Sequence, residues 1–276
     1  MDIAYDGTDF HGWARQPGLR TVQGLLEDAL WKQPPGREAP RSVVVAGRTD
    51  SGVHASRQAV HVDVAPFAPG QGGRLPVDES GIPDLQQLCS RWNRILPGDV
   101  RVLNARVAAA GFDARFSALR RHYLYRVSDA PWGVDPLRRR NTLGWNRPLD
   151  VERLNAGARE LLGLRDFAAF CKQREGATTV RELQCFSWER VEEHLVVARV
   201  SADAFCHSMV RSLVGSLLMV GDGRRESGWP AEILRSGVRT SAVAPAHGLT
   251  LLDIDYPADD ELAARAAHTR AVRTLE

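Results

Sequence analysis

The sequence has almost no lysine. Of its 36 lysines and arginines, only Lys32 and Lys172 are lysines, and the formal net charge of the 276-residue chain is +2. Arginine suits phosphate binding, because its planar guanidinium donates paired hydrogen bonds and stacks on bases. The basic runs at 120–122 and 138–140 are therefore compatible with nucleic-acid binding, although an ordinary solvated surface accounts equally well for each run alone.

Cysteines and long apolar runs are also scarce. The cysteines have no C-x-x-C spacing, which argues against a metal knuckle, and we expect each to be a free thiol within a helix or strand in a reducing compartment. They are Cys89, Cys171, Cys185 and Cys206. The longest apolar stretch, 213–220, is too short to span a bilayer, and the first residues read as a strand rather than a signal peptide. We therefore expect a soluble, cytoplasmic protein.

Several common catalytic signatures are missing. The chain has neither a phosphate-binding G-x-x-x-x-G-K-[ST] segment nor a dinucleotide fingerprint, and Ser51-Gly52 lacks the setting of a nucleophile elbow. The histidines that we considered as metal ligands show no H-x-x-x-H pair. They are His11, His54, His61, His122 and His207. We expect neither a metal nor a cofactor.

The order of predicted elements favours an α+β fold. Apolar periodicity and turn residues divide the chain into strands and helices without a regular βαβ rhythm, which indicates a largely antiparallel sheet. We expect strands at 3–5, 42–46, 58–64, 100–107, 121–127, 180–188, 195–200 and 249–255, and helices from the Thr21 cap to Pro34 and at 85–96, 151–162 and 205–220. Residues 66–83 predict a mobile surface loop, and the tail from Pro257 is either a surface helix or frayed.

The segment 47–55, Gly-Arg-Thr-Asp-Ser-Gly-Val-His-Ala, is the first candidate site. It forms a predicted loop between two strands, where a rigid frame can present a side chain to a ligand. In extended backbone, Arg48 and Asp50 project to the same side, and the guanidinium would keep the carboxylate ionised. For an isolated Arg-x-Asp, the commoner arrangement is a turn in which the aspartate caps local amides.

Tyr123 and Arg211 are further candidates. Tyr123 and Tyr125 alternate on one face of a predicted strand beside Arg120 and Arg121, where an aromatic ring could stack on an extruded base. For Tyr125 we expect a core position instead. Arg211 lies on the polar side of an apolar helix and is either a surface arginine or a partner for a buried carboxylate.

Six segments in order resemble the tRNA pseudouridine synthase A (TruA) family of pseudouridine synthases. They are AYDGTDFHGWARQPGLRTVQGLLEDAL, AGRTDSGVHA, NRILPGD, FDARFSALRRHYLYR, AFCHSMVRSLVGSL and APAHGLTLLDIDY. Together they extend over roughly residues 2–257, and six spaced motifs are far more specific than one.

The resemblance implies a role for each candidate. Asp50 would be the catalytic nucleophile, Tyr123 would contact the flipped uridine, and Arg48 and Arg211 would lie beside the carboxylate. It implies a homodimeric isomerase that converts uridine to pseudouridine at positions 38, 39 and 40 in the anticodon stem-loop of tRNA. It also implies two similar α+β (ferredoxin/RRM-like) halves that share a largely antiparallel sheet with a central basic cleft. We place an N-terminal domain at 1–107, a C-terminal domain at 108–257 and a tail at 258–276.

Other chemistry and other classes stay open at this stage. The carboxylate could attack C1′ of the ribose or add to the uracil ring. The arginine runs and aromatic platform also fit a non-catalytic RNA-binding protein, which would not need Asp50. A nucleosidase would release free uracil, but no second carboxylate is placed as its acid.

Overall fold

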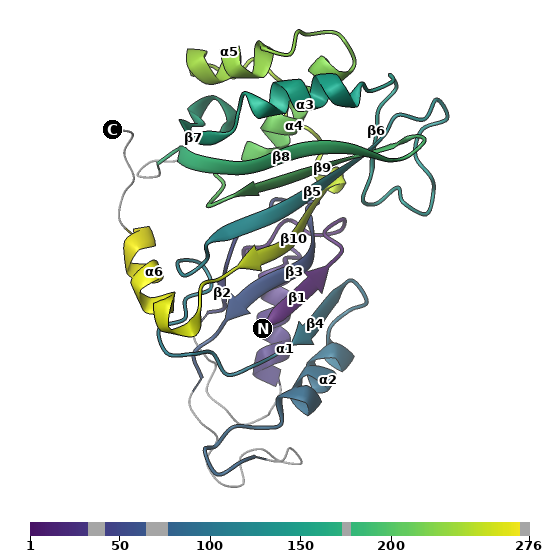
Figure 1. The fold of residues 1–276 in the computed structure, drawn as a ribbon. Coiled ribbons are helices and arrows are strands. Elements are labelled where there is room, and N and C mark those ends of the chain that lie inside the picture. The colour runs from purple at the N-terminus through teal and green to yellow at the C-terminus, as the bar shows by residue number, and fades with distance from the viewer. Residues whose placement is uncertain (33–41, 65–76, 173–177, 271–276) are drawn as a thin grey trace. The chain divides into compact units, whose positions relative to one another are not determined.

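The computed structural model describes residues 1–32, 42–64, 77–172 and 178–270. These residues form two compact units. The first consists of Met1–Ala118 with Tyr256–Thr269, and the second of Leu119–Asp255. In Figure 1 the first unit is coloured purple to blue, with the yellow α6 at its end, and the second unit begins in teal.

The first unit is built on a small antiparallel sheet. Its elements are β1 (Asp2–Tyr5), α1 (Val22–Lys32), β2 (Val44–Val45), β3 (His54–His61), α2 (Leu85–Ile95), β4 (Val100–Asn104), η3 (Asp259–Glu261) and α6 (Leu262–Arg270). β1 lies between β3 and β4 and pairs antiparallel with both, and β2 pairs with β3. The chain returns to this unit through Tyr256, whose hydroxyl donates to the Ala114 carbonyl over 2.7 Å.

Both long helices of the first unit start at a side-chain cap, of which Thr21 was predicted. Thr21 accepts a hydrogen bond from the Gly24 N–H over 3.3 Å, and Asp84 accepts one from Gln87 over 3.0 Å. The apolar stripe of α2 is buried at Leu88, Cys89 and Trp92, whereas Ile95 is 38% exposed. The helical spacing of Leu85, Leu88, Cys89, Trp92 and Ile95 predicts one apolar face, and its three middle residues are buried while Leu85 is half-buried and Ile95 exposed.

The second unit contains a larger sheet with the strand order β10-β5-β9-β8-β7, in which all neighbours pair antiparallel. Its elements are β5 (Arg120–Ser128), β6 (Leu143–Gly144), α3 (Val151–Arg159), β7 (Gly163–Asp166), η1 (Ala168–Phe170), β8 (Val180–Glu192), β9 (Leu195–Ala202), α4 (Met209–Gly221), α5 (Trp229–Ser236), η2 (Ala246–Gly248) and β10 (Leu249–Asp255). The short β6 pairs parallel with the end of β5. The predicted α+β class with a mostly antiparallel sheet is confirmed.

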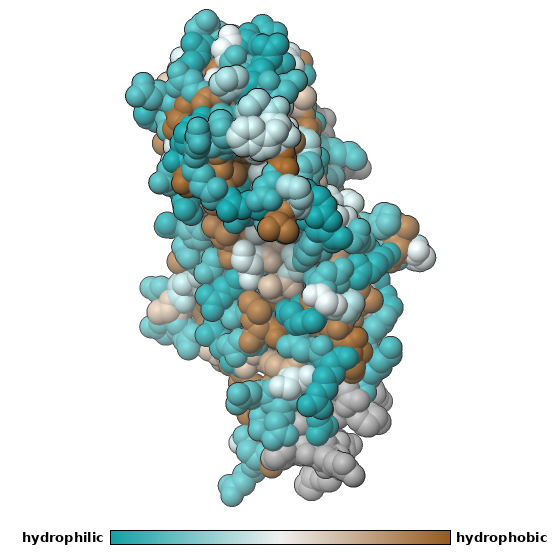
Figure 2. Space-filling view, turned by 90° about the vertical axis from the view of Figure 1, so that its right-hand side faces the viewer, coloured by the Kyte–Doolittle hydropathy of each residue, from teal (hydrophilic) through white to brown (hydrophobic). Residues whose placement is uncertain are grey.

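Helix α3 packs against β8 of the second sheet, and α4 and α5 lie on the same side of it (Figure 1). α4 is apolar and almost entirely buried, and it packs against α3, α5 and η1. Hydrophilic residues predominate on the surface shown in Figure 2, with apolar residues in small separate groups. None of the helices among the described residues is long and apolar enough to cross a membrane.

An ion pair between the buried Asp129 and the more exposed Arg190 fixes one end of this sheet. Arg190 donates to both carboxylate oxygens of Asp129, over 3.0 and 2.7 Å, and the Leu149 N–H donates to Asp129 over 2.9 Å. Burial works to raise the pKa of Asp129, but these hydrogen bonds outweigh it and hold the pKa below its ordinary value.

Asp129→Asn is expected to lower the free energy of unfolding by about 1–3 kcal/mol near neutral pH, because it leaves the Arg190 fork without its anion. Since the folded pKa lies below the unfolded one, the stabilisation by Asp129 is present above about pH 3.9 and is lost as the pH falls through the folded value. Urea unfolding of both proteins at several pH values tests this. A difference that stayed constant into strong acid would contradict it.

Several predicted boundaries are wrong. β2 is only Val44–Val45, and β3 begins at His54 rather than at Gln58 and ends at His61, so Val64 lies outside the strand and is 53% exposed. The loop before β3 is accordingly shorter than predicted. α4 begins at Met209 rather than near Phe205, because the residues before it form a turn.

The prediction of four free, regularly structured cysteines is also wrong. Cys171 and Cys206 form a disulfide, and both lie outside helices and strands. Only Cys89, in α2, and Cys185, in β8, are free. Spacing could not reveal the pair, because its members are 35 residues apart and meet only through the fold.

Four other predictions concern the end of the first helix, the 66–83 loop, the tail and the domain boundaries. Residues 33–41, where we placed the end of the first helix, and most of the predicted 66–83 loop lie outside the described residues. Residues 77–83 form a turn in which Asp78 accepts hydrogen bonds from Ser80 and Ile82. The tail forms α6, as one of the two alternatives predicted. The division into domains at 107 and 257 stays a prediction, and the compact units divide at Ala118 and Tyr256.

Candidate active site

Asp50 lies in the first unit, in the loop between β2 and β3, and its side chain is half-buried. The residue before it holds the loop to the sheet. Thr49 is buried, its hydroxyl lies 2.8 Å from the Tyr5 hydroxyl, and its carbonyl accepts the Trp13 N–H over 3.0 Å. Thr49 therefore fixes the backbone immediately before Asp50.

Tyr5, the hydrogen-bond partner of Thr49, keeps one protonation state over the physiological pH range. Burial raises the pKa of Tyr5 to about 12, although hydrogen bonds with Thr49 and Gln58 oppose the shift. The phenol is therefore neutral throughout the physiological range. Gln58 also donates to the Gly47 carbonyl over 2.7 Å, which fixes the start of the loop.

The other side of the loop packs against residues 7–12. Ser51 donates to the Phe10 carbonyl over 2.9 Å, and the Val53 N–H donates to the Asp50 carbonyl over 3.2 Å. A Cβ at Gly12, which has a φ of +88°, would lie 3.0 Å from the Thr49 carbonyl oxygen. Hydrogen bonds thus hold the backbone on both sides of Asp50. At Gly12 the neighbouring backbone is so close that a larger residue has little room.

Arg48 and Asp50 belong to the same loop, as predicted. Arg48 is exposed and Asp50 is half-buried, so the guanidinium is the more accessible of the two. His54 begins β3 as a buried residue, and its Nδ1 accepts the Gly7 N–H over 3.0 Å. That hydrogen bond gives His54 a structural role at the end of the loop.

Tyr123 lies in the second unit on β5 and is 8% exposed. The ring of Phe205 packs edge-on against it, with ring centroids 5.1 Å apart and an interplanar angle of 88°. Tyr125 is fully buried and its hydroxyl donates to the Pro245 carbonyl over 2.7 Å. The prediction that Tyr125 is a core residue is confirmed.

Arg211 lies in the first turn of α4 and is half-buried. Its Nε donates to the Ala244 carbonyl over 2.8 Å, while the Ala244 N–H donates to the Arg211 carbonyl over 3.0 Å. Burial raises the pKa of Tyr125, and the nearby Arg211 guanidinium opposes this shift. Arg211 is therefore a fixed cation near Tyr125 of β5.

Arg48 and Asp50 thus lie in one loop of the first unit, and Tyr123 and Arg211 lie in the second unit. Among the described residues, no group of three or more histidine, cysteine, aspartate or glutamate side chains could hold a metal ion. Sequence reasoning missed Phe205. Its position in AFCHSMVRSLVGSL, the segment that also contains Arg211, could have indicated it.

Comparison of the sequence with known proteins shows which family the chain belongs to. A family model described as tRNA pseudouridine synthase matches residues 158–257. Relatives named tRNA pseudouridine synthase A match nearly the whole chain. The one from Frankia casuarinae is 55% identical over 275 residues, that from Mycobacterium leprae 53% over 279, and that from Corynebacterium glutamicum 51% over 281.

Each of these three alignments covers 99% of this chain and 94% of the relative. At this identity and coverage the chain belongs to the tRNA pseudouridine synthase A family. The resemblance predicted from the six ordered segments is confirmed, and with it the enzyme class, an isomerase.

Proposed function

We propose that the protein converts uridine to pseudouridine at positions 38, 39 and 40 in the anticodon stem-loop of tRNA, with Asp50 as nucleophile. Membership of the tRNA pseudouridine synthase A family supports tRNA as the substrate. The observation that carries the role of Asp50 is its loop, in which Thr49, Ser51 and Val53 fix the backbone on both sides of the carboxylate. The enzyme acts in the cytoplasm as a homodimer, without metal or cofactor.

The reaction breaks the bond from N1 of uracil to C1′ of ribose and forms a bond from C5 to C1′. The C5 hydrogen is released as a proton, while N1 acquires one, so no redox partner is needed. The carboxylate of Asp50 either attacks C1′ as the glycosidic bond breaks or adds to the ring. Because it must be ionised to do so, the guanidinium of Arg48 in the same loop would favour the reactive form, and the family resemblance implies the same role for Arg211.

The uridine must leave the helical stack to reach the carboxylate. Tyr123 would contact the flipped base, and its ring is already restrained by Phe205. The exposed Arg48 is available to phosphates of the RNA backbone, which position a substrate without reading its sequence. The fixed loop and the restrained ring both reduce the reorganisation needed once the base is bound.

Tritium release tests the proposal. The full chain is incubated with tRNA that contains 5-tritiated uridine and that comes from a strain lacking its own modification at these positions. We expect release of the C5 tritium, and chemical mapping should place pseudouridine at positions 38 to 40 of the anticodon arm. Release of free uracil would indicate a nucleosidase instead. Binding of tRNA without tritium release would support the non-catalytic RNA-binding alternative.

A further inference from the structure

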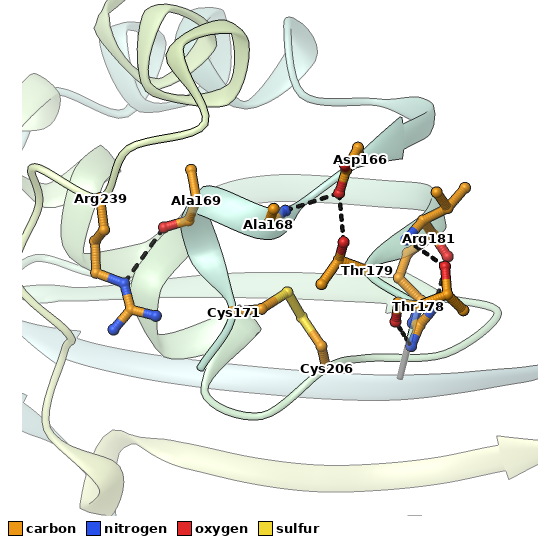
Figure 3. The surroundings of a disulfide bond; sticks show 10 residues. Asp166, Ala168, Ala169, Cys171, Thr178, Thr179, Arg181, Cys206 and Arg239 are labelled. Carbon is orange, nitrogen blue, oxygen red and sulfur yellow. Dashed lines mark hydrogen bonds between the residues drawn. A yellow bond between two sulfur atoms is a disulfide. The ribbon is translucent and has the colours of Figure 1, made fainter. Parts of the chain in front are cut away.

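The Cys171–Cys206 disulfide joins two segments of the second unit (Figure 3). The Cα atoms of the two cysteines are 5.6 Å apart. A backbone hydrogen bond reinforces the link, since the Lys172 N–H donates to the His207 carbonyl over 3.0 Å. Residues 171–172 therefore hold residues 206–207 through one covalent and one hydrogen bond.

The Cys171 side of this link is fixed in the core. Cys171 is buried and follows η1, whose Phe170 is fully buried. Asp166 accepts hydrogen bonds from the Ala168 N–H over 3.0 Å and from the Thr179 hydroxyl over 2.6 Å, as Figure 3 shows. This segment is a rigid base for the disulfide.

The Cys206 side belongs to the connection 203–208 between β9 and α4, here called the β9–α4 loop. Its first residue, Asp203, is buried and accepts the Glu182 N–H over 2.9 Å, and the Asp203 carbonyl accepts a hydrogen bond from Arg121 over 2.6 Å. At its other end Ser208 has a φ of 65°, and it is the one non-glycine residue with positive φ among those described. Such a conformation persists only where the surroundings hold it.

The β9–α4 loop presents Phe205 to Tyr123. Phe205 lies immediately before Cys206, and its ring meets the Tyr123 ring edge-on at 5.1 Å. The loop then leads within three residues of Ser208 to Arg211 in the first turn of α4. The disulfide therefore constrains the segment whose Phe205 contacts Tyr123, a predicted substrate-binding residue. The same segment leads to Arg211, which is another.

We propose that Phe205 is a positioning residue for Tyr123, and that the Cys171–Cys206 disulfide holds it there, so that catalysis depends on the oxidation state of this pair. The inference rests on the proposed function, in which Tyr123 contacts the flipped uridine. In the oxidised protein the β9–α4 loop is fixed at both ends. In the reduced protein the covalent link is lost, the loop is anchored by Asp203 and by hydrogen bonds such as that from Lys172 to His207, and the edge-on contact of Phe205 with Tyr123 loosens.

The redox step needs a thiol reductant. Attack by a dithiol breaks the Sγ–Sγ bond, and two electrons and two protons pass to the cysteines, which become thiols while the dithiol closes to its own disulfide. Oxidation by a disulfide compound runs the exchange in reverse. Disulfides in cytosolic proteins are usually transient or redox-sensing, which fits a reversible role for this pair in the proposed compartment.

The test compares the oxidised and reduced full chain. Thiols are counted by alkylation under denaturing conditions, and we expect two in the oxidised protein, from Cys89 and Cys185, and four after treatment with a dithiol. In tritium-release assays, reduction should lower kcat by about tenfold with a smaller change in KM, because the ring is misplaced rather than removed. Hydrogen exchange of the β9–α4 loop should be faster in the reduced protein.

Variants separate positioning from general stability. Cys206→Ser should match the reduced wild type and no longer respond to the dithiol, whereas Cys185→Ser, at an exposed free cysteine, should respond as wild type does. Phe205→Leu should lower kcat in both oxidation states. Phe205→Tyr keeps the ring and should have the kcat of wild type. Circular dichroism and thermal unfolding confirm that each variant is folded.

Equal kcat and equal loop exchange in proteins with two and four thiols would overturn the inference. Phe205→Leu with the kcat of wild type would overturn the positioning role. If the oxidised wild type released no tritium, the proposed function itself would fail. The loop exchange would then still decide whether the disulfide holds the β9–α4 loop, because that measurement needs no activity.

Discussion

Asp50→Asn is expected to abolish pseudouridine formation, with a loss of about 10⁴-fold or more in kcat, while the protein stays folded. Asparagine has nearly the same shape as aspartate but is neutral and cannot act as the carboxylate nucleophile. The loop should keep its conformation, since its anchors are the Thr49 hydroxyl and carbonyl, the Ser51 hydroxyl and the Asp50 backbone carbonyl. The loss should therefore fall on kcat rather than on tRNA binding.

Single-turnover tritium release and a tRNA binding assay measure the two effects separately. Asp63→Asn is the matched control, because Asp63 is an exposed aspartate of the same unit outside the loop, and we expect it to keep wild-type activity. Urea unfolding of all three proteins should give nearly the same midpoint. An Asp50→Asn enzyme with substantial activity would contradict the nucleophile role.

Much of the secondary structure was predictable because local signals act within a few residues. The last strand, Leu249–Asp255, is placed correctly at both ends, and α2 begins at its Asp84 cap. The short strands β6 and β7 were missed. All four residues of β7 are exposed, so they show no alternation of buried and exposed positions for a pattern to detect.

The site was predictable in its residues but not in its geometry. The GRTD segment identified Asp50 and Arg48, and the resemblance added Tyr123 and Arg211. Neither revealed that Thr49 is anchored on Tyr5 or that Phe205 packs against Tyr123, since these contacts join residues 44 and 82 positions apart. Nonlocal contacts of this kind depend on strand pairing, which a single sequence pattern does not specify.

Gly7 is the residue on which the shape of the Asp50 loop depends most directly. A Cβ at position 7 would lie 2.0 Å from the carbonyl oxygen of Val53 and 2.5 Å from its carbonyl carbon. These are backbone atoms, so they cannot move aside as a flexible side chain would. The Gly7 N–H also donates to His54, so a shift of residue 7 would disturb the start of β3 as well.

Gly7→Ala is therefore expected to lower the free energy of unfolding by about 3 kcal/mol, at the upper end of what overpacking usually costs. It should also reduce the rate of pseudouridine formation by about 100-fold, because displacement of Val53 moves the turn that it closes with Asp50. Urea unfolding and single-turnover tritium release measure the two losses.

Gly98→Ala provides the control for both measurements. It makes the same substitution in the same unit, at a position where the added Cβ would meet nothing within 4 Å. We expect Gly98→Ala to unfold within about 0.5 kcal/mol of wild type and to keep its activity, as surface substitutions usually do. If the two alanine variants were equally stable and equally active, the close packing of residue 7 against Val53 would not be what fixes the loop, and the orientation of Asp50 would have to depend on Thr49 and Ser51 alone.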